Sequence, residues 1–404
     1  MITKETNLVI ATAVFLAITI IDFYFKSTMM DWSVIAIKYI QSWPRILYYW
    51  YWIFAGPVYY LIPVIGHLCF FMLGEKNHAL MIFMMIGFEN TVTNLLKLIY
   101  NDLRPCFLDQ EIADFACTCS FGKPSGHSSS SVTLYVGLYY ILIHSNARIS
   151  RNVKRAIIVA TAIMLLNVGA SRLYFGAHFI NQVLLGWALA YLILSIFYIL
   201  HRNGVFETIV YPYGTEKHRR KTIMNIIIGV FLIIHVLILI SWYFVRYYLE
   251  NKTPHPFNET DCADKCVQSQ GFLSDVCITA SSFYTSIVYI SIGFRLREGE
   301  LAVYNSRYYS VFFSNIKIIS IRLLVWILVM SPLALGLALS KQKGLMMWIS
   351  NNGFCLIFAL LFFFAMRPLM RLLNVSVKGD YFEVDAGEIL EEKTNQEPDA
   401  VQID

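Results

Sequence analysis

Three short segments of this 404-residue chain hold side chains of the types that bind and attack a phosphate group. In the first, Lys97 and Arg104 stand seven residues apart, and Pro105 follows directly. On a helix, seven residues make two turns, about 10 Å, so the two cations would share one face. The guanidinium could then hold a phosphate as a planar fork while the ammonium acts as a point charge. Taken alone, cations at the end of an apolar helix are more often interfacial anchors.

The second segment, residues 122–128, contains the run P-S-G-H. Proline suits the first turn of a helix, so Pro124 predicts that a helix begins here. The backbone amides of Ser125, Gly126 and His127 would then be free at a helix N-terminus, where an anion binds well. His127 also suits general acid catalysis, because the pKa of an imidazole lies near neutrality. The serine hydroxyls that follow could instead simply cap the helix.

The third segment, residues 171–182, combines a further cation with a second histidine. Arg172 could donate hydrogen bonds to a phosphate, and His178 lies four residues before Gln182. At the start of a helix this spacing would put His178 and Gln182 on one face. The Gln182 carbonyl could accept one ring N–H and leave the other ring nitrogen free to attack. A single histidine in a loop is, however, more often structural.

The composition indicates a membrane protein. Hydrophobic residues make up 57% of the chain and charged residues 15%, with a mean hydropathy of +0.57. Soluble domains are typically about half apolar and about a quarter charged. The apolar residues fall in blocks of about 18 or more, the length that crosses a bilayer. The net charge of +5 is spread over several loops, which indicates membrane topology and argues against nucleic acid as a partner.

These blocks predict an all-α fold, a polytopic transmembrane helical bundle of about nine or ten spans. The first block follows Lys4 and has no small-residue cleavage site after it, so we expect a retained anchor and not a signal peptide. Residues 32–43 form either a helix on the membrane surface or a simple connector. The expected spans are residues 8–25, 47–73, 79–97, 130–145, 156–171, 179–200, 223–245, 278–294, 322–340 and 346–366.

Positive residues and glycosylation sequons agree on the orientation of these spans. The clusters of Lys and Arg in the loops all fall on one side, which the positive-inside rule makes cytosolic. On the other side, Asn251 and Asn258 lie in glycosylation sequons of the loop 246–277. Six of the eight cysteines also lie on that side, where disulfides persist, with zinc ligation as the alternative.

The chain divides into four parts on this basis. Residues 1–46 form an N-terminal anchor span and an interfacial segment. Residues 47–201 form the catalytic membrane core with all three phosphate-related segments. Residues 202–377 hold the C-terminal membrane spans and the glycosylated luminal loop. Residues 378–404 are acidic and poor in apolar residues, which is typical of a disordered cytosolic tail.

Taken together, the ordered motifs K-x6-R-P, P-S-G-H and S-R-x5-H resemble those of the type 2 phosphatidic acid phosphatase (PAP2) superfamily. That superfamily also includes vanadium haloperoxidases and glucose-6-phosphatases. The resemblance covers about residues 79–200 and implies a helical catalytic core of the same kind. Most members carry Asp four residues after the second histidine, where this chain has Gln182. In that exchange, and in the stretch SRLYFGAHFINQVLLG, the chain is similar to the glucose-6-phosphatase branch.

The resemblance implies a phosphatase that works through a phosphohistidine. His178 would attack phosphorus, and Gln182 would orient its ring. His127 would protonate the leaving alcohol and then activate water. Neither a cofactor nor a metal is expected, since no carboxylate cluster stands near the motifs. The expected phosphate ligands are Lys97, Arg104, Ser125, Gly126 and Arg172.

The expected partner, besides membrane lipids, is a small-molecule phosphate ester on the luminal side. A sugar phosphate such as glucose 6-phosphate is preferred, with a lipid phosphate such as phosphatidate or a sphingoid phosphate as the alternative. A non-catalytic membrane protein or transporter is a further alternative, because Glu89, Asn90 and Asn94 lie within a span. The expected compartment is the endoplasmic reticulum, with the plasma membrane or another endomembrane as alternatives.

Overall fold

The computed structural model describes four stretches of the chain and a few single positions. The stretches are residues 4–55, 76–113, 121–144 and 149–203, to which Phe115 and single positions between 222 and 373 are added. Most of the four C-terminal expected spans, the loop with Asn251 and Asn258, and the acidic tail lie outside the described residues.

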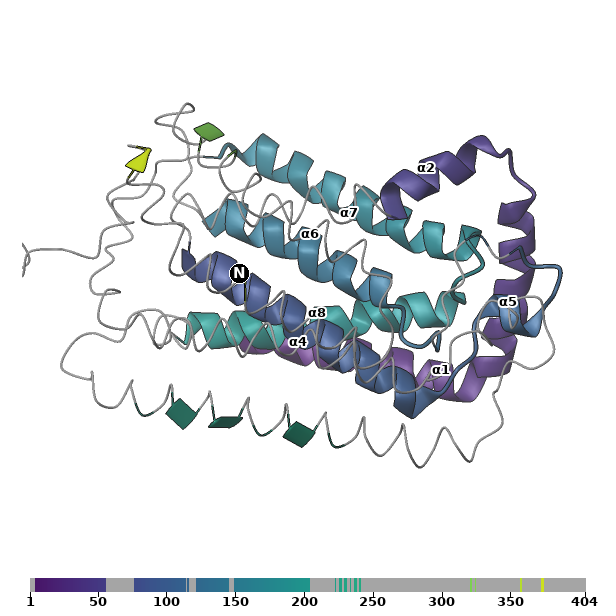
Figure 1. The fold of residues 1–404 in the computed structure, drawn as a ribbon, viewed down its shortest axis with the longest axis horizontal. Coiled ribbons are helices and arrows are strands. Elements are labelled where there is room, and N and C mark those ends of the chain that lie inside the picture. Colours follow the sequence, from purple (N-terminus) through teal and green to yellow (C-terminus); the bar gives the residue numbers. More distant parts are fainter. Residues whose placement is uncertain are drawn as a thin grey trace, which may run out of the picture.

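Every secondary-structure element in the described stretches is a helix, so the all-α prediction is confirmed there (Figure 1). The long helices run beside one another, and the loops before α5, α6 and α8 gather at one end of the bundle. The helices are α1 (Lys4–Gln41), α2 (Ile46–Ala55), α4 (Lys76–Tyr100), α5 (Pro105–Leu108), α6 (Gly126–His144), α7 (Arg151–Tyr174) and α8 (Ile180–Arg202).

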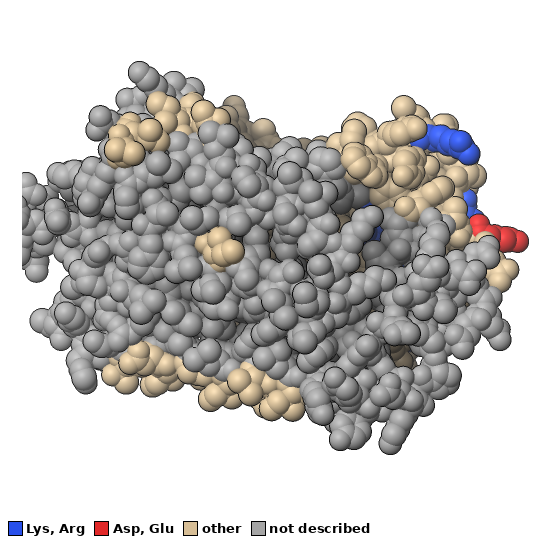
Figure 2. Space-filling view, viewed as in Figure 1, with Lys and Arg blue, Asp and Glu red and all other residues tan. Residues whose placement is uncertain are grey.

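Five of the expected spans, at residues 8–25, 79–97, 130–145, 156–171 and 179–200, overlap α1, α4, α6, α7 and α8. Among the described residues, α1, α7 and α8 are long and apolar enough to cross a membrane. Large apolar side chains of α1 and α7, such as Leu16, Phe23 and Leu166, are exposed, which suits contact with lipid. On the face drawn in Figure 2, the described Lys, Arg, Asp and Glu lie near the α5 end. The chain is therefore an integral membrane protein.

Helix α1 is longer than one span and bends at Phe25, whose φ of −117° and ψ of 19° are not helical. Its second half takes in residues 32–41, so most of the segment 32–43 is helical. This half reaches the loop after α5, where Lys38 forms ion pairs with Asp109 (2.8 Å) and Glu111 (2.6 Å). The end of α1 is thereby fastened to the site end of the bundle.

Helix α8 packs against α1, α4 and α6, and Gly186 allows a close approach to the start of α6. A Cβ at Gly186 would lie 2.6 Å from the carbonyl oxygen of Ser125, at the start of α6. The backbone amide of Ser125 in turn donates to the carbonyl oxygen of Gln182 at 3.0 Å. The P-S-G-H segment is therefore held directly against the first two turns of α8.

The loop between α7 and α8 is anchored by apolar side chains on both sides of His178. Phe175 and Ala177 pack with Tyr51 of α2, and Phe179 packs with Ile37 of α1. The turn that starts this loop uses Gly176, whose φ of +64° lies in the left-handed region that favours glycine. These contacts fix the backbone on either side of His178.

The close approach at Gly186 predicts that Gly186→Ala destabilises the protein. The added methyl group overlaps backbone that cannot move without displacing α6, and overpacking of this kind costs about 1–3 kcal/mol. The measurement is thermal unfolding of the detergent-solubilised full chain. Gly229→Ala is the control, because a Cβ there would meet no atom within 4 Å. Equal melting temperatures for the two variants would contradict the packing described here.

Candidate active site

The side chain of His178 touches residues of all three motif-bearing regions of the sequence. It lies in the loop between α7 and α8 and is 3% exposed. Its Nε2 atom lies 3.2 Å from Nη1 of Arg104. Its Nδ1 atom lies 2.8 Å from the carbonyl oxygen of Gly122 and 3.2 Å from Oε1 of Gln182. The tertiary structure therefore brings together segments up to about 80 residues apart, as expected for a single site.

These contacts determine which ring nitrogen of His178 carries the proton. Both oxygens at Nδ1 are acceptors, so Nδ1 is the N–H donor. A guanidinium can only donate, so Nε2 offers its lone pair toward Arg104. The expected role of Gln182 as an acceptor for the ring matches this geometry. The Gly122 carbonyl, a second acceptor, was not expected, because a backbone oxygen leaves no trace in the sequence.

The amide of Gln182 is itself held in one orientation. Its Nε2 atom donates to the carbonyl oxygen of Leu103 at 2.9 Å, and its Oε1 atom also accepts from the backbone amide of Phe179 at 3.3 Å. Gln182 lies in the first turn of α8, whereas His178 precedes that helix. The expectation that both residues share a helix face was therefore wrong, and their contact arises because the loop folds back over the first turn.

Lys97 and Arg104 are both buried at the site, but they do not share a helix as the seven-residue spacing predicted. Helix α4 ends at Tyr100, and Asn101 has a φ of 50° that turns the chain away. Arg104 is extended, with its Nη1 donating to the carbonyl oxygen of Ala177 at 2.9 Å. The left-handed turn at Asn101 breaks the helix before Pro105 can, so Arg104 reaches the site from a loop.

The P-S-G-H segment begins α6, as the sequence predicted. Ser125 precedes the helix, and its Oγ atom lies 3.4 Å from the backbone amide of Ser128 as an N-terminal cap. The Ser125 amide was expected to be free but donates to the carbonyl oxygen of Gln182. At Gly126, a Cβ would lie 3.8 Å from Nζ of Lys97, so the first turn of α6 faces that ammonium closely. Ser125 therefore has only its hydroxyl to offer a ligand.

Arg172 and His127 complete the set of expected site residues. Arg172 lies in the last turn of α7, buried, with its guanidinium 5.2 Å from the centre of the Phe175 ring. His127 lies in the first turn of α6, before the expected span. Burial lowers the pKa of His127 well below its usual value, and the positive charges of Arg172, Lys97 and Arg104 lower it further. The structure thus places His127 within the field of all three cations.

The same forces act on His178. Burial lowers the pKa of His178 well below its usual value, and the charges of Arg104, Lys97 and Arg172 lower it further. With a pKa so far below neutrality, the ring is uncharged at pH 7 and its Nε2 lone pair is available. A site that gathers three buried cations around a neutral imidazole favours an anionic ligand beside Nε2.

Glu89 binds neighbouring helices together. This buried carboxylate of α4 accepts hydrogen bonds from Thr93 (2.9 Å), Ser130 (2.9 Å) and Ser129, of which the two serines belong to α6. Hydrogen bonds that satisfy this buried carboxylate therefore join α4 to α6. In the described part of the chain, no group of three or more His, Cys, Asp or Glu side chains could hold a metal ion.

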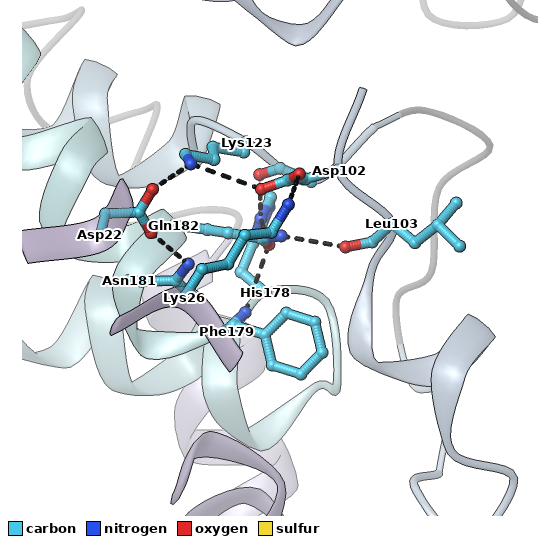
Figure 3. A network of polar contacts seen from close by, with 10 residues as sticks. Asp22, Lys26, Asp102, Leu103, Lys123, His178, Phe179, Asn181 and Gln182 are labelled. Carbon is cyan, nitrogen blue, oxygen red and sulfur yellow. Dashed lines mark hydrogen bonds and ion pairs between the residues drawn. The ribbon is translucent and has the colours of Figure 1, made fainter. Parts of the chain in front are cut away.

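A cluster of charged residues beside the site was not expected from the sequence (Figure 3). Asp22 of α1 forms an ion pair with Lys123, and Lys26 of α1 forms one with Asp102. Asp22 also accepts a hydrogen bond from Nδ2 of Asn181 at 2.6 Å. The one available signal was Asp22 itself, an acidic residue within an apolar span, which is costly unless it has a partner.

Comparison with known proteins shows that most of the site residues lie in a segment that matches one protein family. Residues 78–205 match the family model described as the PAP2 superfamily. That match supports PAP2 superfamily membership. The PAP2 segment, residues 78–205, contains the three motifs and the site residues from Lys97 to Gln182, whereas α1 and α2 precede it.

The PAP2 segment is also similar to a bacterial enzyme. Phosphatidylglycerophosphatase B of Bacillus subtilis (strain 168) is 33% identical over 133 residues, which are 33% of this chain and 62% of that protein. The chain thus spans less than two thirds of that relative's length. Because this relative is a phosphatidylglycerophosphatase, the expected closeness to the glucose-6-phosphatase branch is not confirmed.

Among solved structures, a crystal structure described as the first transmembrane PAP2 type phosphatidylglycerolphosphate phosphatase, also from Bacillus subtilis, is similar at a TM-score of 0.41. It is 22% identical, and the matched region covers 48% of this chain and 96% of that chain.

Replacing Gly122 by Ala is expected to slow the phosphatase activity that the motifs predict. A Cβ at position 122 would lie 2.4 Å from Oε1 of Gln182, so the amide must leave the place from which it accepts the His178 N–H. Misplacing a reacting group by about 1 Å costs about 100-fold in rate, so we expect kcat to fall by about 10- to 100-fold. The measurement is steady-state hydrolysis of a phosphate monoester by the purified full chain.

The double variant Gly122→Ala/Gln182→Ala is the control for this substitution. Once the Gln182 side chain is removed, the added methyl group no longer displaces it, so Gly122→Ala should add little to the loss caused by Gln182→Ala. Fully additive losses would contradict an effect transmitted through Gln182.

Proposed function

We propose that this chain is a membrane phosphatase that hydrolyses a lipid phosphate monoester through a phosphohistidine at His178. The observation that carries the proposal is the ring of His178, with its protonated Nδ1 held by two oxygen acceptors and its Nε2 directed at Arg104. A neutral imidazole held in one tautomer beside a phosphate-binding cation is an activated nucleophile.

The buried cations supply the binding energy for the phosphate. Arg104, Lys97 and Arg172 would neutralise its negative charge, and they would do so more strongly in the transition state, where charge builds on the equatorial oxygens. The first turn of α6 at Gly126 would add the positive end of a helix, next to Lys97. Ser125 would contribute through its hydroxyl group.

The reaction would then proceed in two steps. In the first, the bond between Nε2 of His178 and phosphorus forms as the bond to the leaving oxygen breaks, and His127 gives that oxygen a proton. In the second, His127 takes a proton from water, the resulting hydroxide attacks phosphorus, and His178 is released. A bound phosphate dianion raises the pKa of His127, which offsets the cations and loads it with the proton that the first step needs.

The choice of a lipid substrate is supported by the relative, which is a phosphatidylglycerophosphatase. It replaces the sugar phosphate preferred from the sequence. One observation still favours a sugar phosphate as the second candidate, namely the amide of Gln182 where most of the superfamily carries Asp. Since the relative matches a third of this chain, the two substrate classes need a direct test.

We also propose that the site opens on the non-cytosolic side of the membrane, with the endoplasmic reticulum as the expected compartment. The basic residues Arg151, Lys154 and Arg155 open α7, and the site lies at the other end of that helix, about 36 Å away. The positive-inside rule puts those basic residues in the cytosol. Cys106, beside the site, is disulfide-bonded, which supports an oxidising compartment.

The proposed nucleophile predicts that His178→Ala forms no phosphoenzyme and hydrolyses no substrate. His127→Ala should retain phosphoenzyme formation from a phenolic ester such as p-nitrophenyl phosphate, whose leaving group needs no acid. With an alkyl ester, the same variant should lose about 100- to 10,000-fold in rate, the usual worth of a general acid. Phosphoenzyme is measured by rapid quench with labelled substrate. Labelling that persists in His178→Ala would rule out this mechanism.

The proposed substrate class predicts that phosphatidate and phosphatidylglycerophosphate in mixed micelles outcompete glucose 6-phosphate. A pocket that binds acyl chains should raise kcat/KM for the lipids by about 10-fold or more over the soluble sugar. The measurement is phosphate release by the purified full chain on both classes, with His178→Ala as the blank. A higher kcat/KM for glucose 6-phosphate would favour the sugar-phosphate candidate instead.

A further inference from the structure

We propose that Asp22, on the N-terminal helix α1, is a positioning residue for the nucleophile His178. The inference rests on the proposed function, and it concerns a helix that precedes the PAP2 segment. In this proposal Asp22 ties together the two backbone segments that carry the acceptors of the His178 N–H.

The side chain of Asp22 is buried, where a carboxylate destabilises the fold unless partners compensate its charge. It is 3% exposed, although its neighbours Ile21 and Phe23 are exposed apolar residues of the same helix. Burying a carboxylate without partners costs far more than any single contact returns. Asp22 has two partners, an ion pair with Lys123 and a hydrogen bond of 2.6 Å from Asn181.

Each partner of Asp22 is the sequence neighbour of a residue that orients His178. Lys123 follows Gly122, whose carbonyl oxygen lies 2.8 Å from Nδ1 of the ring. Asn181 precedes Gln182, whose Oε1 lies 3.2 Å from the same atom. One carboxylate therefore spans the two segments, and Figure 3 shows it joined to both of them.

A third segment, residues 102–103, closes this arrangement. The backbone amide of Gly122 donates to the carbonyl oxygen of Asp102 at 2.7 Å. The side chain of Gln182 donates to the carbonyl oxygen of Leu103. Lys123 also lies 3.5 Å from Oδ2 of Asp102. Movement of any one segment would therefore shift an acceptor of the His178 ring.

The charges in this cluster balance one another, in contrast to the cations of the phosphate site. Asp22, Lys123, Asp102 and Lys26 alternate in sign and sum to zero. Lys123 is buried, and its ammonium lies 4.3 Å from the centre of the Tyr100 ring. Lys123 stands directly before the P-S-G-H run, yet its charge is already matched by carboxylates. Its role is to connect Gly122 to α1, and binding of phosphate is left to the other cations.

The test compares Asp22→Asn with Asp22→Glu and with a control on the same helix. Lys38→Met removes the ion pairs of α1 with Asp109 and Glu111, neither of which is an acceptor of the His178 ring. All variants are full chains in detergent. A rapid-quench experiment with labelled lipid phosphate gives two quantities, the amplitude of the phosphoenzyme burst and the rate at which it forms.

The expected result is a slower burst with full amplitude. Asp22→Asn should lower the rate of phosphoenzyme formation by about 10- to 100-fold, because the His178 ring loses its fixed orientation. Its KM should stay within about threefold, since no phosphate ligand is changed. Asp22→Glu should recover part of the rate, and Lys38→Met should leave the rate unchanged. A loss of folded protein would lower the amplitude and not the rate.

A second variant keeps the proposal testable if Asp22→Asn folds poorly. In Asp22→Asn/Lys123→Met the buried ammonium that has lost its Asp22 partner is removed as well, so folding should recover while the slow burst persists. A wild-type rate in Asp22→Asn or in Asp22→Asn/Lys123→Met would overturn the inference and leave the proposed function intact. The absence of any phosphohistidine in the wild-type chain would overturn both.

Discussion

The site depends on keeping one imidazole neutral and in one orientation among buried positive charges. Burial and the charges of Arg104 and Lys97 lower the pKa of His178, so the ring stays uncharged. Its orientation must then come from acceptors that fix the Nδ1 proton. The chain uses a backbone carbonyl and the amide of Gln182 for this purpose. Neither acceptor carries a full charge, so both orient the ring while stabilising the imidazolium less than a carboxylate would.

The cations near His178 fall into two groups that differ in their acceptors. Arg104 donates to the neutral carbonyl oxygens of Ala177 and Phe121, so these bonds hold the guanidinium without cancelling its charge. Lys123 instead lies between the carboxylates of Asp22 and Asp102. The first kind of cation retains its attraction for an anionic ligand, whereas the second is neutralised within the protein. Lys123 stands beside the P-S-G-H run in the sequence, but this position does not make it a phosphate ligand. The partners of each cation distinguish the two groups.

Helix α1 shows how a helix that precedes the PAP2 segment becomes part of the site. Its apolar face suits lipid, while Asp22, Ser33 and Gln41 reach inward to residues of the matched segment. The hydroxyl of Ser33 accepts from the first amide of α8 at 3.1 Å, next to the His178 loop. The bend at Phe25 lies between Asp22 and the two later contact residues, Ser33 and Gln41. The site is thus enclosed by more of the chain than the three motifs.

The sequence by itself determined the residue types of the site, the order of the motifs and the helical class, because apolar block length and proline and glycine placement act locally. It therefore predicted that a helix starts at the P-S-G-H run and that Gln182 serves the His178 ring. The tertiary structure decided what depends on residues distant in the chain. The Asn101 turn brings Arg104 in from a loop, Gly122 offers its carbonyl oxygen, and Asp22 pairs across 101 residues with Lys123. Local periodicity cannot encode such contacts, since a backbone oxygen is the same in every residue and an ion pair forms only where folding brings its two charges together.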